Sequence, residues 1–365
     1  MKTFDFAIVG AGIAGASLAA ELSATGASVL LLEAEDRPGY HSTGRSAAFW
    51  EECYGGPDIV PLTLASGRYL REGGFLTQRG ALYVGRDSDA NALDRFEQRF
   101  EGTGVTIEPL RRQALEQRLP GLRPDWTRAI WQPACADIDV GALHQHYLAM
   151  AKRGGVELVC RARIVDASRR NGRWTLTDAA GESWTAGALI NAAGAWADEF
   201  AQLAGARPVG IQPLRRTVVQ LRVAPQVPPE LPLVLDIGGG FYFKPESGRV
   251  WLSPHDEEPS EPCDAAPEEL AVAQAIDRFE SVVDWQVEAV ERKWAGLRSF
   301  APDRRPVYGW DPHVEGFGWF AGQGGFGIQT SPAAARLAAQ LFTGRPSDDL
   351  TRGIVPSPYL ATRFG

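Results

Sequence analysis

The chain opens with a glycine pattern that determines how its first residues can fold. Gly10, Gly12 and Gly15 form G-x-G-x-x-G directly after an apolar run, residues 4–9, and before a helix-forming stretch. In a strand–turn–helix unit such glycines let the backbone approach a pyrophosphate, and the helix N-terminus attracts the phosphate charge. Glu33 ends the next apolar run, where a carboxylate can accept hydrogen bonds from a ribose diol. The pattern therefore predicts a βαβ unit that binds a dinucleotide, with a tightly packed glycine turn as the alternative.

Composition argues against several kinds of partner. With 365 residues, 44% of them hydrophobic and 22% charged, the chain is expected to fold into two domains. A formal net charge of −8 argues against nucleic acid, because proteins that bind nucleic acid carry clustered Lys and Arg. No apolar run reaches the roughly 18 residues that span a bilayer, and the first run does not resemble a signal peptide. We therefore expect a cytoplasmic protein without a transmembrane segment.

Metal and disulfide chemistry find no support in the sequence. The four cysteines lie far apart and form no C-x-x-C pair. His144 and His146 are two residues apart on an expected helix, so their side chains point in different directions and do not share a metal. The acidic run at residues 255–262 is expected to be a solvated loop.

The α/β alternation is interrupted twice by segments with a different pattern. Residues 81–139 contain a strand and two charged helices, and residues 209–295 contain strands rich in Val, Leu, Phe and Tyr. Residues 140–208 and 296–365 return to helix–strand alternation. The fold class we predict is α/β, in the two-domain α+β sense. A discontinuous Rossmann-like domain (1–80, 140–208 and 296–365) would carry an inserted antiparallel-sheet domain for the substrate (81–139 and 209–295).

Four further segments indicate which dinucleotide is bound. They are AEDRPGYHSTGRSAAFW at residues 34–50, LINAAGAW at 189–196, KWAGLRSFAPDRRPVYG at 293–309 and GQGGFGIQTSPAAARLA at 322–338. In content and order they resemble the D-amino acid oxidase and glycine oxidase superfamily of flavoenzymes, most closely the D-arginine dehydrogenase type. The resemblance extends over nearly the whole chain. It implies that the Rossmann-like domain binds FAD, non-covalently.

The resemblance also implies which residues hold the cofactor. In this family the S-T-G-R-S loop lies against the flavin, where small residues permit close approach. The NAAGAW strand end passes beside the dinucleotide, and GQGGFGIQT precedes a helix whose dipole stabilises negative charge on the reduced flavin. The implied cofactor-binding residues are Gly10, Gly12, Ile13, Ala14, Gly15, Glu33, Ala34, Ser42, Thr43, Arg45, Ser46, Ala47, Ile164, Val165, Ala193, Gly194, Trp196, Gly324, Gly325, Gly327, Ile328 and Gln329.

Arginines are the expected partners of the substrate's carboxylate. Arg215 and Arg216 are adjacent on an expected strand, where side chains alternate between faces, so only one of them can enter the cavity. The resemblance selects Arg215 and leaves Arg216 in solvent. Arg298 stands where the family has a carboxylate-binding arginine, whose planar guanidinium can form two parallel hydrogen bonds. Structural salt bridges are the alternative for Arg215 and Arg298.

Two tyrosines and a glycine complete the expected catalytic site. Tyr242 lies between Phe241 and Phe243, which should face the other way, and the family uses a tyrosine here to bind the carboxylate. Tyr54 lies in a loop that covers the active site in relatives. The carbonyl of Gly325 is expected to accept a hydrogen bond from the amine. The alternative for each tyrosine is a half-buried core ring.

Two departures from the D-arginine dehydrogenase pattern point to another substrate. Phe49 replaces a histidine, and Ala81 replaces the acid that would bind a cationic side chain. We therefore expect a D-amino acid with a neutral, apolar side chain. Hydride transfer from Cα to flavin N5 would give an imine, which hydrolyses to a 2-oxo acid and ammonia.

Three other activities stay open at this point. A glycine or N-methyl amino acid (sarcosine) oxidase would use the same arginines. A flavin-binding electron-transfer or assembly protein would turn over no substrate, and a nicotinamide dehydrogenase would share the glycine pattern. The electron acceptor, whether a quinone, a carrier or O₂, is also open; the strand at residues 249–253 has no lysine for oxygen activation, which favours a dehydrogenase.

Overall fold

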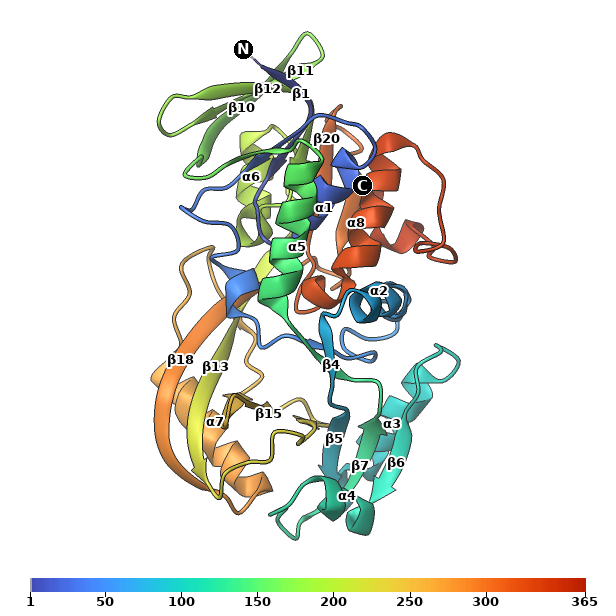
Figure 1. Ribbon diagram of the computed structural model, residues 1–365, viewed down its shortest axis with the longest axis vertical. Helices are drawn as coiled ribbons and strands as arrows, with labels where there is room; N and C mark the ends of the chain where they lie inside the picture. Colours follow the sequence, from blue (N-terminus) through green and yellow to red (C-terminus); the bar gives the residue numbers. More distant parts are fainter. Residues whose placement is uncertain (1) are drawn as a thin grey trace.

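The computed structural model describes residues 2–365, and an eight-stranded sheet forms the upper half of the molecule in Figure 1. Its central strands run parallel in the order β12-β1-β2-β9, and β20 extends the parallel part beyond β12. Buried on both faces, such strands are apolar throughout, as in the VLLL sequence of β2. The strands are β1 (Thr3–Val9), β2 (Val29–Leu32), β9 (Glu157–Val159), β10 (Ile164–Arg170), β11 (Arg173–Asp178), β12 (Ser183–Asn191), β19 (Val307–Trp310) and β20 (Phe317–Ala321).

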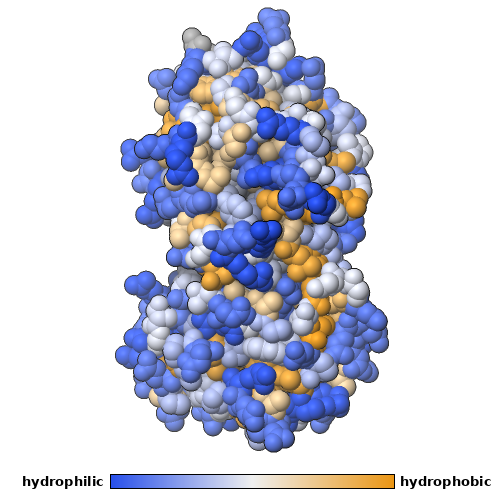
Figure 2. Space-filling model, turned by 45° about the vertical axis from the view of Figure 1, so that its right-hand side comes forward, coloured by the Kyte–Doolittle hydropathy of each residue, from blue (hydrophilic) through white to orange (hydrophobic). Residues whose placement is uncertain are grey.

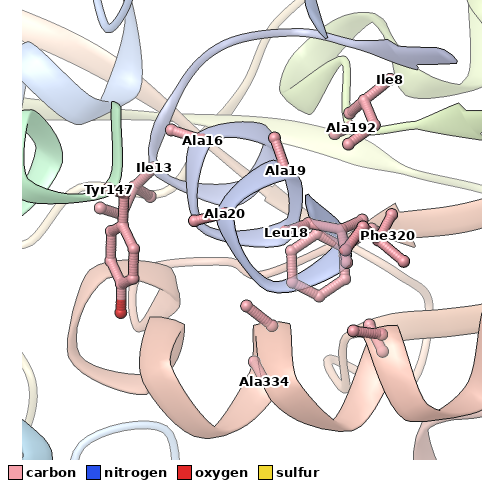
Figure 3. Packing of buried hydrophobic residues seen from close by; sticks show 14 of the residues in the cluster. Ile8, Ile13, Ala16, Leu18, Ala19, Ala20, Tyr147, Ala192, Phe320 and Ala334 are labelled. Atoms are coloured by element: carbon pink, nitrogen blue, oxygen red, sulfur yellow. The ribbon is translucent and has the colours of Figure 1, made fainter. Parts of the chain in front are cut away.

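Helices cover both faces of this sheet. On one face α1 (Ile13–Ser23) packs against α5 (Val140–Arg153) and α8 (Gly327–Thr343), and α2 (Val60–Glu72) packs on α8. In Figure 3, α1 lies between the strand that carries Ile8 and the helix that carries Ala334. Its alanines let these neighbours approach closely, so the helix is buried on nearly all sides. On the other face lies α6 (Ala197–Leu203).

A second sheet, of nine strands, forms the lower half of the molecule. Its order is β17-β13-β16-β15-β14-β5-β7-β6, with β18 also paired to β13. The helices α3 (Ala90–Phe100), α4 (Arg112–Arg118) and α7 (Glu269–Val282) accompany it. Its strands are β5 (Ala81–Arg86), β6 (Glu108–Arg111), β7 (Trp126–Gln132), β13 (Gln212–Ala224), β14 (Leu233–Asp236), β15 (Tyr242–Glu246), β16 (Arg249–Ser253), β17 (Glu258–Pro259) and β18 (Gln286–Phe300). A small sheet of β3 (Phe49–Trp50), β4 (Leu76–Gln78) and β8 (Ala136–Ile138) lies apart from both.

The second sheet departs from the expected antiparallel pattern at one pair. β5 and β14 pair in parallel. They come from different insertions, and the long stretch of chain between them permits this direction. The other pairs in this sheet are antiparallel. β18 runs past residue 295, where we expected the insertion to end, and continues to Phe300.

Hydrophilic and apolar residues are unevenly distributed on the surface. Figure 2 shows a mostly hydrophilic face on which apolar residues gather near the waist between the two halves.

Among residues 2–365, no helix has the length and apolar character needed to cross a bilayer. Within the same residues the four cysteines are free, and no cluster of His, Cys, Asp and Glu has the arrangement of a metal site.

Candidate functional site

A cavity of about 760 Å³ lies where the carboxyl ends of β1 and β12 face β13 and β18. Open α/β sheets bind their ligands at these strand ends. All the cofactor-binding residues that we predicted line it except Gly15. A Cβ on Gly15 would lie 1.8 Å from the carbonyl oxygen of Gly10. Gly15 therefore permits the close packing of α1 on the glycine turn and does not reach the cavity.

The glycine turn brings backbone to the wall of the cavity, which Gly10 and Gly12 line. Gly10 has φ +102°, and a Cβ there would lie 2.3 Å from the carbonyl oxygen of Ala192. α1 starts after Gly12 without a side-chain cap. Glu33 fixes the turn, because its Oε2 accepts a hydrogen bond from the Ala11 N–H at 2.9 Å. The Ile13 N–H donates to Thr43 Oγ1 at 2.9 Å. The N-terminus of α1 at the cavity wall suits a pyrophosphate through its dipole.

A second helix begins at the far side of the cavity. α8 starts after Phe326, which provides no side-chain cap. Its first residues, Gly327 and Ile328, line the cavity, so the positive end of the helix dipole lies there. Gly325 precedes it, and a Cβ there would lie 2.5 Å from Arg298 Nη1 and 2.9 Å from Tyr54 Oη. Only glycine leaves room at this position.

The α6 side of the cavity is mostly apolar, with Glu199 of α6 as a carboxylate in its lining. Val165 and Leu203 line it and are 48% and 36% exposed, beside the cavity-lining Ile164 and Phe200. Exposed apolar surface inside a cavity is typical of a ligand site, here one suited to an adenine ring. With helix N-termini for phosphates and glycines beside α8, the residues present fit FAD.

The opposite end of the cavity carries two guanidinium groups, but not the pair that we predicted. Arg216 lines the cavity and is 6% exposed, whereas Arg215 points to the other face of β13, where its Nη1 donates to Glu268 Oε1 at 2.6 Å. The prediction that Arg215 enters the cavity and Arg216 lies in solvent is therefore wrong. Leu214, Arg216 and Val218 share the face of β13 that also receives Arg298 from β18, and this register was not visible in the sequence.

Arg216 and Arg298 have donors available for an anion. Burial lowers the pKa of Arg216, and the charge of Arg298 nearby lowers it further. Arg216 Nη1 and Arg298 Nε have no hydrogen-bond partner within residues 2–365. Arg298 Nη1 donates to Tyr54 Oη at 2.6 Å. A carboxylate entering here would satisfy buried N–H groups that otherwise lack a partner.

Aromatic rings form the wall beside these arginines. Phe49, Tyr54 and Tyr242 line the cavity, and the Phe49 ring centroid lies 5.1 Å from that of Tyr54 and 5.7 Å from that of Tyr242. Burial raises the pKa of Tyr242, so its hydroxyl stays protonated. Phe241 and Phe243 belong to the core on the other side, as predicted.

Ala81 does not belong to the wall that we predicted. It is fully buried at the start of β5, in the same apolar cluster as Phe49 and Tyr242, and it does not line the cavity. Its side chain is too short to extend past the rings of this cluster.

Sequence reasoning missed how the Tyr54 loop is held. Gln329, predicted to touch the cofactor, lines the cavity but uses its amide elsewhere. Its Oε1 accepts from the Glu51 N–H at 3.1 Å, and its Nε2 donates to Thr63 Oγ1 at 3.0 Å and to the Tyr54 carbonyl at 3.3 Å. Glu51 is fully buried, and burial raises its pKa to about 7. The pair EE at residues 51 and 52, inside an otherwise apolar stretch, was the available signal.

Sequence reasoning also missed the role of the acidic run at residues 255–262. Asp256 accepts hydrogen bonds from the Thr217 N–H at 2.7 Å and from Thr217 Oγ1 at 2.8 Å. Glu257 pairs with both Arg216 and Arg298. The expectation of a solvated loop is wrong here, because arginines distant in sequence attract these carboxylates.

Known proteins resemble this chain over its whole length. The DAO family model, described as FAD dependent oxidoreductase, matches residues 5–341. Hydrogen cyanide synthase subunit HcnC of Pseudomonas aeruginosa is 27% identical over 416 aligned residues, which cover 100% of this chain and 97% of that protein. The structure of glycine oxidase from Geobacillus kaustophilus matches with a TM-score of 0.85 at 23% identity, covering 100% of this chain and 99% of that one. L-proline dehydrogenase from P. horikoshii matches with a TM-score of 0.84 at 21% identity, covering 96% of each chain. The predicted fold class is confirmed.

Proposed function

Because the chain belongs to the DAO family of FAD-dependent oxidoreductases, we propose that it oxidises the Cα–N bond of a small D-amino acid with a neutral side chain. FAD, when bound, supplies the hydride acceptor. Residues of both sheets orient the amino acid beside it. The product imine hydrolyses to a 2-oxo acid and ammonia.

The carboxylate site carries this proposal. Arg216 and Arg298 converge on one end of a cavity whose other walls fit FAD, and each has an N–H without a partner within residues 2–365. Two guanidinium groups can hold a carboxylate in a fixed plane, which fixes the position of Cα. The hydroxyls of Tyr54 and Tyr242 lie at the same end and add hydrogen-bond donors.

The amine is positioned by backbone rather than by an acid or base. The Gly325 carbonyl, at the start of α8, is the acceptor that we assign to it. The carboxylates that line the cavity, Glu33, Glu35 and Glu199, follow β2 or lie on α6, away from the arginines. The amine itself must then lose its proton before Cα–H cleavage, so kcat/KM is expected to rise with pH through an amine-like ionisation.

The aromatic wall supports a neutral side chain. Phe49, Tyr54 and Tyr242 offer ring faces, and no acid lines this end of the cavity within residues 2–365. The close spacing of the rings also suits a very small substrate. This spacing, with the structural likeness to a glycine oxidase, keeps glycine or sarcosine as the second candidate.

An anaerobic reduction screen tests the proposal. The FAD-loaded protein is mixed with D-Ala, D-Leu, D-Met, D-Phe, D-Arg, glycine, sarcosine and the L-enantiomers, and flavin absorbance is followed. We expect neutral D-amino acids to reduce the flavin fastest. Fastest reduction by glycine or sarcosine selects the second candidate, and fastest reduction by D-Arg or an L-enantiomer contradicts both. Reoxidation in air, compared with reoxidation by a quinone, then identifies the acceptor class.

A further inference from the structure

The acidic strap, which we define as residues 254–259, lies against the arginine end of the cavity. Asp256 attaches it to β13, since its side chain accepts two hydrogen bonds from Thr217 and its carbonyl accepts one from Arg216 Nε at 2.8 Å. β17, at the end of the strap, pairs with β13. The sheet therefore fixes where the strap lies.

The next side chain of the strap joins the two cavity arginines. Glu257 Oε1 accepts a hydrogen bond from Arg298 Nη2, and a second from Arg216 Nη2 at 3.3 Å. Arg304 Nη2 donates to both Glu257 oxygens at 2.9 Å. Glu257 does not line the cavity, whereas Arg216 and Arg298 do. One carboxylate thus bridges both cations from outside the substrate space.

This bridge has a physical consequence for the arginines. Two cations on adjacent strands repel each other, and burial of Arg216 strengthens the repulsion. A shared carboxylate offsets the repulsion and fixes the plane of each guanidinium through a charge-assisted hydrogen bond. Both Nη2 groups donate to Glu257 outside the cavity. Arg216 Nη1 then has no partner within residues 2–365, and Arg298 Nη1 donates to Tyr54 Oη.

We propose that Glu257 is a positioning residue that holds Arg216 and Arg298 together as one clamp for the substrate's carboxylate. The inference rests on the proposed function in one respect, that the ligand of the arginines is a carboxylate. The three arginines Arg216, Arg298 and Arg304 and the two carboxylates Asp256 and Glu257 together carry one net positive charge, which a single carboxylate balances. Glu257 also repels that carboxylate weakly, because both anions share the same guanidinium groups.

Two substitutions separate the effect of the charge of Glu257 from the effect of its side-chain length. Glu257→Gln keeps the shape and removes the charge, and Glu257→Asp keeps the charge and withdraws it by one methylene. Glu258→Gln is the matched control, because the Glu258 side chain is exposed and forms no ion pair within the described chain. Each FAD-loaded variant is assayed for the rate of flavin reduction at saturating amino acid and for the Kd of benzoate, a carboxylate probe read from the flavin spectrum.

We expect both Glu257 variants to reduce flavin at least about tenfold more slowly, because Cα is no longer held in place. The Kd of benzoate is expected to fall about threefold or more in Glu257→Gln, which has lost the competing anion. The Kd is expected to stay unchanged in Glu257→Asp, which keeps it. A purely structural role would instead weaken benzoate and FAD binding together. The control should match the wild type in both measurements.

The remaining outcomes of these measurements contradict the proposal or test it without the amino acid. A reduction rate of Glu257→Gln within about twofold of the wild type, or weaker benzoate binding by this variant, contradicts the proposal. If no amino acid reduces the wild-type flavin, the proposed function fails, and the role of Glu257 is then tested by benzoate binding alone. Tighter benzoate binding by Glu257→Gln supports the bridge between the arginines, and unchanged binding contradicts it. A wild-type protein that binds no carboxylate contradicts the clamp itself.

Discussion

Arg215 and Arg216 are neighbours in the chain, yet their guanidinium groups lie in different environments. Arg216 faces the cavity, and Arg215 pairs with Glu268 on the other side of β13. Arg216→Leu removes a charge-assisted donor to the substrate's carboxylate and should lower kcat/KM by about tenfold to a hundredfold. Arg215→Leu, the matched control, should change kcat/KM by less than about twofold. Equal losses in the two variants, measured by steady-state kinetics, would contradict the assignment.

Glu51 should make stability depend on pH. Burial raises its pKa from 4.5 to about 7, although Tyr83 Oη donates to it at 2.7 Å. The folded state thus binds this proton more tightly than the unfolded state, so its contribution is fully present below pH 4.5 and is lost as pH rises through about 7.

Glu51→Gln removes this dependence. The variant should exceed the wild type in free energy of unfolding by up to about 3 kcal/mol at about pH 8, and by much less at about pH 5. Urea unfolding at the two pH values measures the difference, and Glu258→Gln should show none. A constant difference across pH would mean that Glu51 does not titrate in this range.

At the scale of elements, α8 and the loop at residues 51–59 act together through one side chain. Gln329 of α8 joins the Glu51 N–H and the Tyr54 carbonyl, so the position of Tyr54 depends on a helix distant in sequence. Gln329→Leu leaves a buried N–H without its partner, at a cost of about 1 to 3 kcal/mol, and frees the loop. We expect faster hydrogen exchange at residues 51–59 and a higher KM. Unchanged exchange in this loop would show that Gln329 does not hold it.

The elements also show how far sequence reasoning extends. The glycine turn, α1 and Glu33 were predictable because the relevant contacts lie within about thirty residues and depend on local backbone geometry. The face of β13 was not predictable, because the register with β18 sets which of Arg215 and Arg216 meets Arg298. Glu257 was missed for the same reason: its partners Arg298 and Arg304 are more than forty residues away, and a run of acids usually lies in solvent.

At the scale of the whole molecule, the cavity is lined by both sheets, so its ligand should stabilise both halves. The glycine turn and β10 of the first sheet and β13, β15 and β18 of the second all contribute residues to its lining. A ligand that binds only the folded state adds about 2.7 kcal/mol at a concentration of a hundred times Kd. We expect calorimetry to show a melting temperature several degrees higher with FAD than without it. An unchanged melting temperature in the presence of FAD would contradict the assignment of this cavity as the FAD site.

The strand order of the first sheet has a consequence for synthesis. β1 pairs with β12, and β12 pairs with β20, so the sheet that begins at Thr3 is completed only by residues 317–321. At roughly 5 to 20 residues per second, the ribosome makes β1 many seconds before β20, the last strand of the sheet, emerges. One edge of the apolar end of β12 therefore stays unpaired until β20 emerges, and we expect the nascent chain to need chaperone protection during that interval. Truncated chains ending before β20 should neither retain FAD nor escape proteolysis.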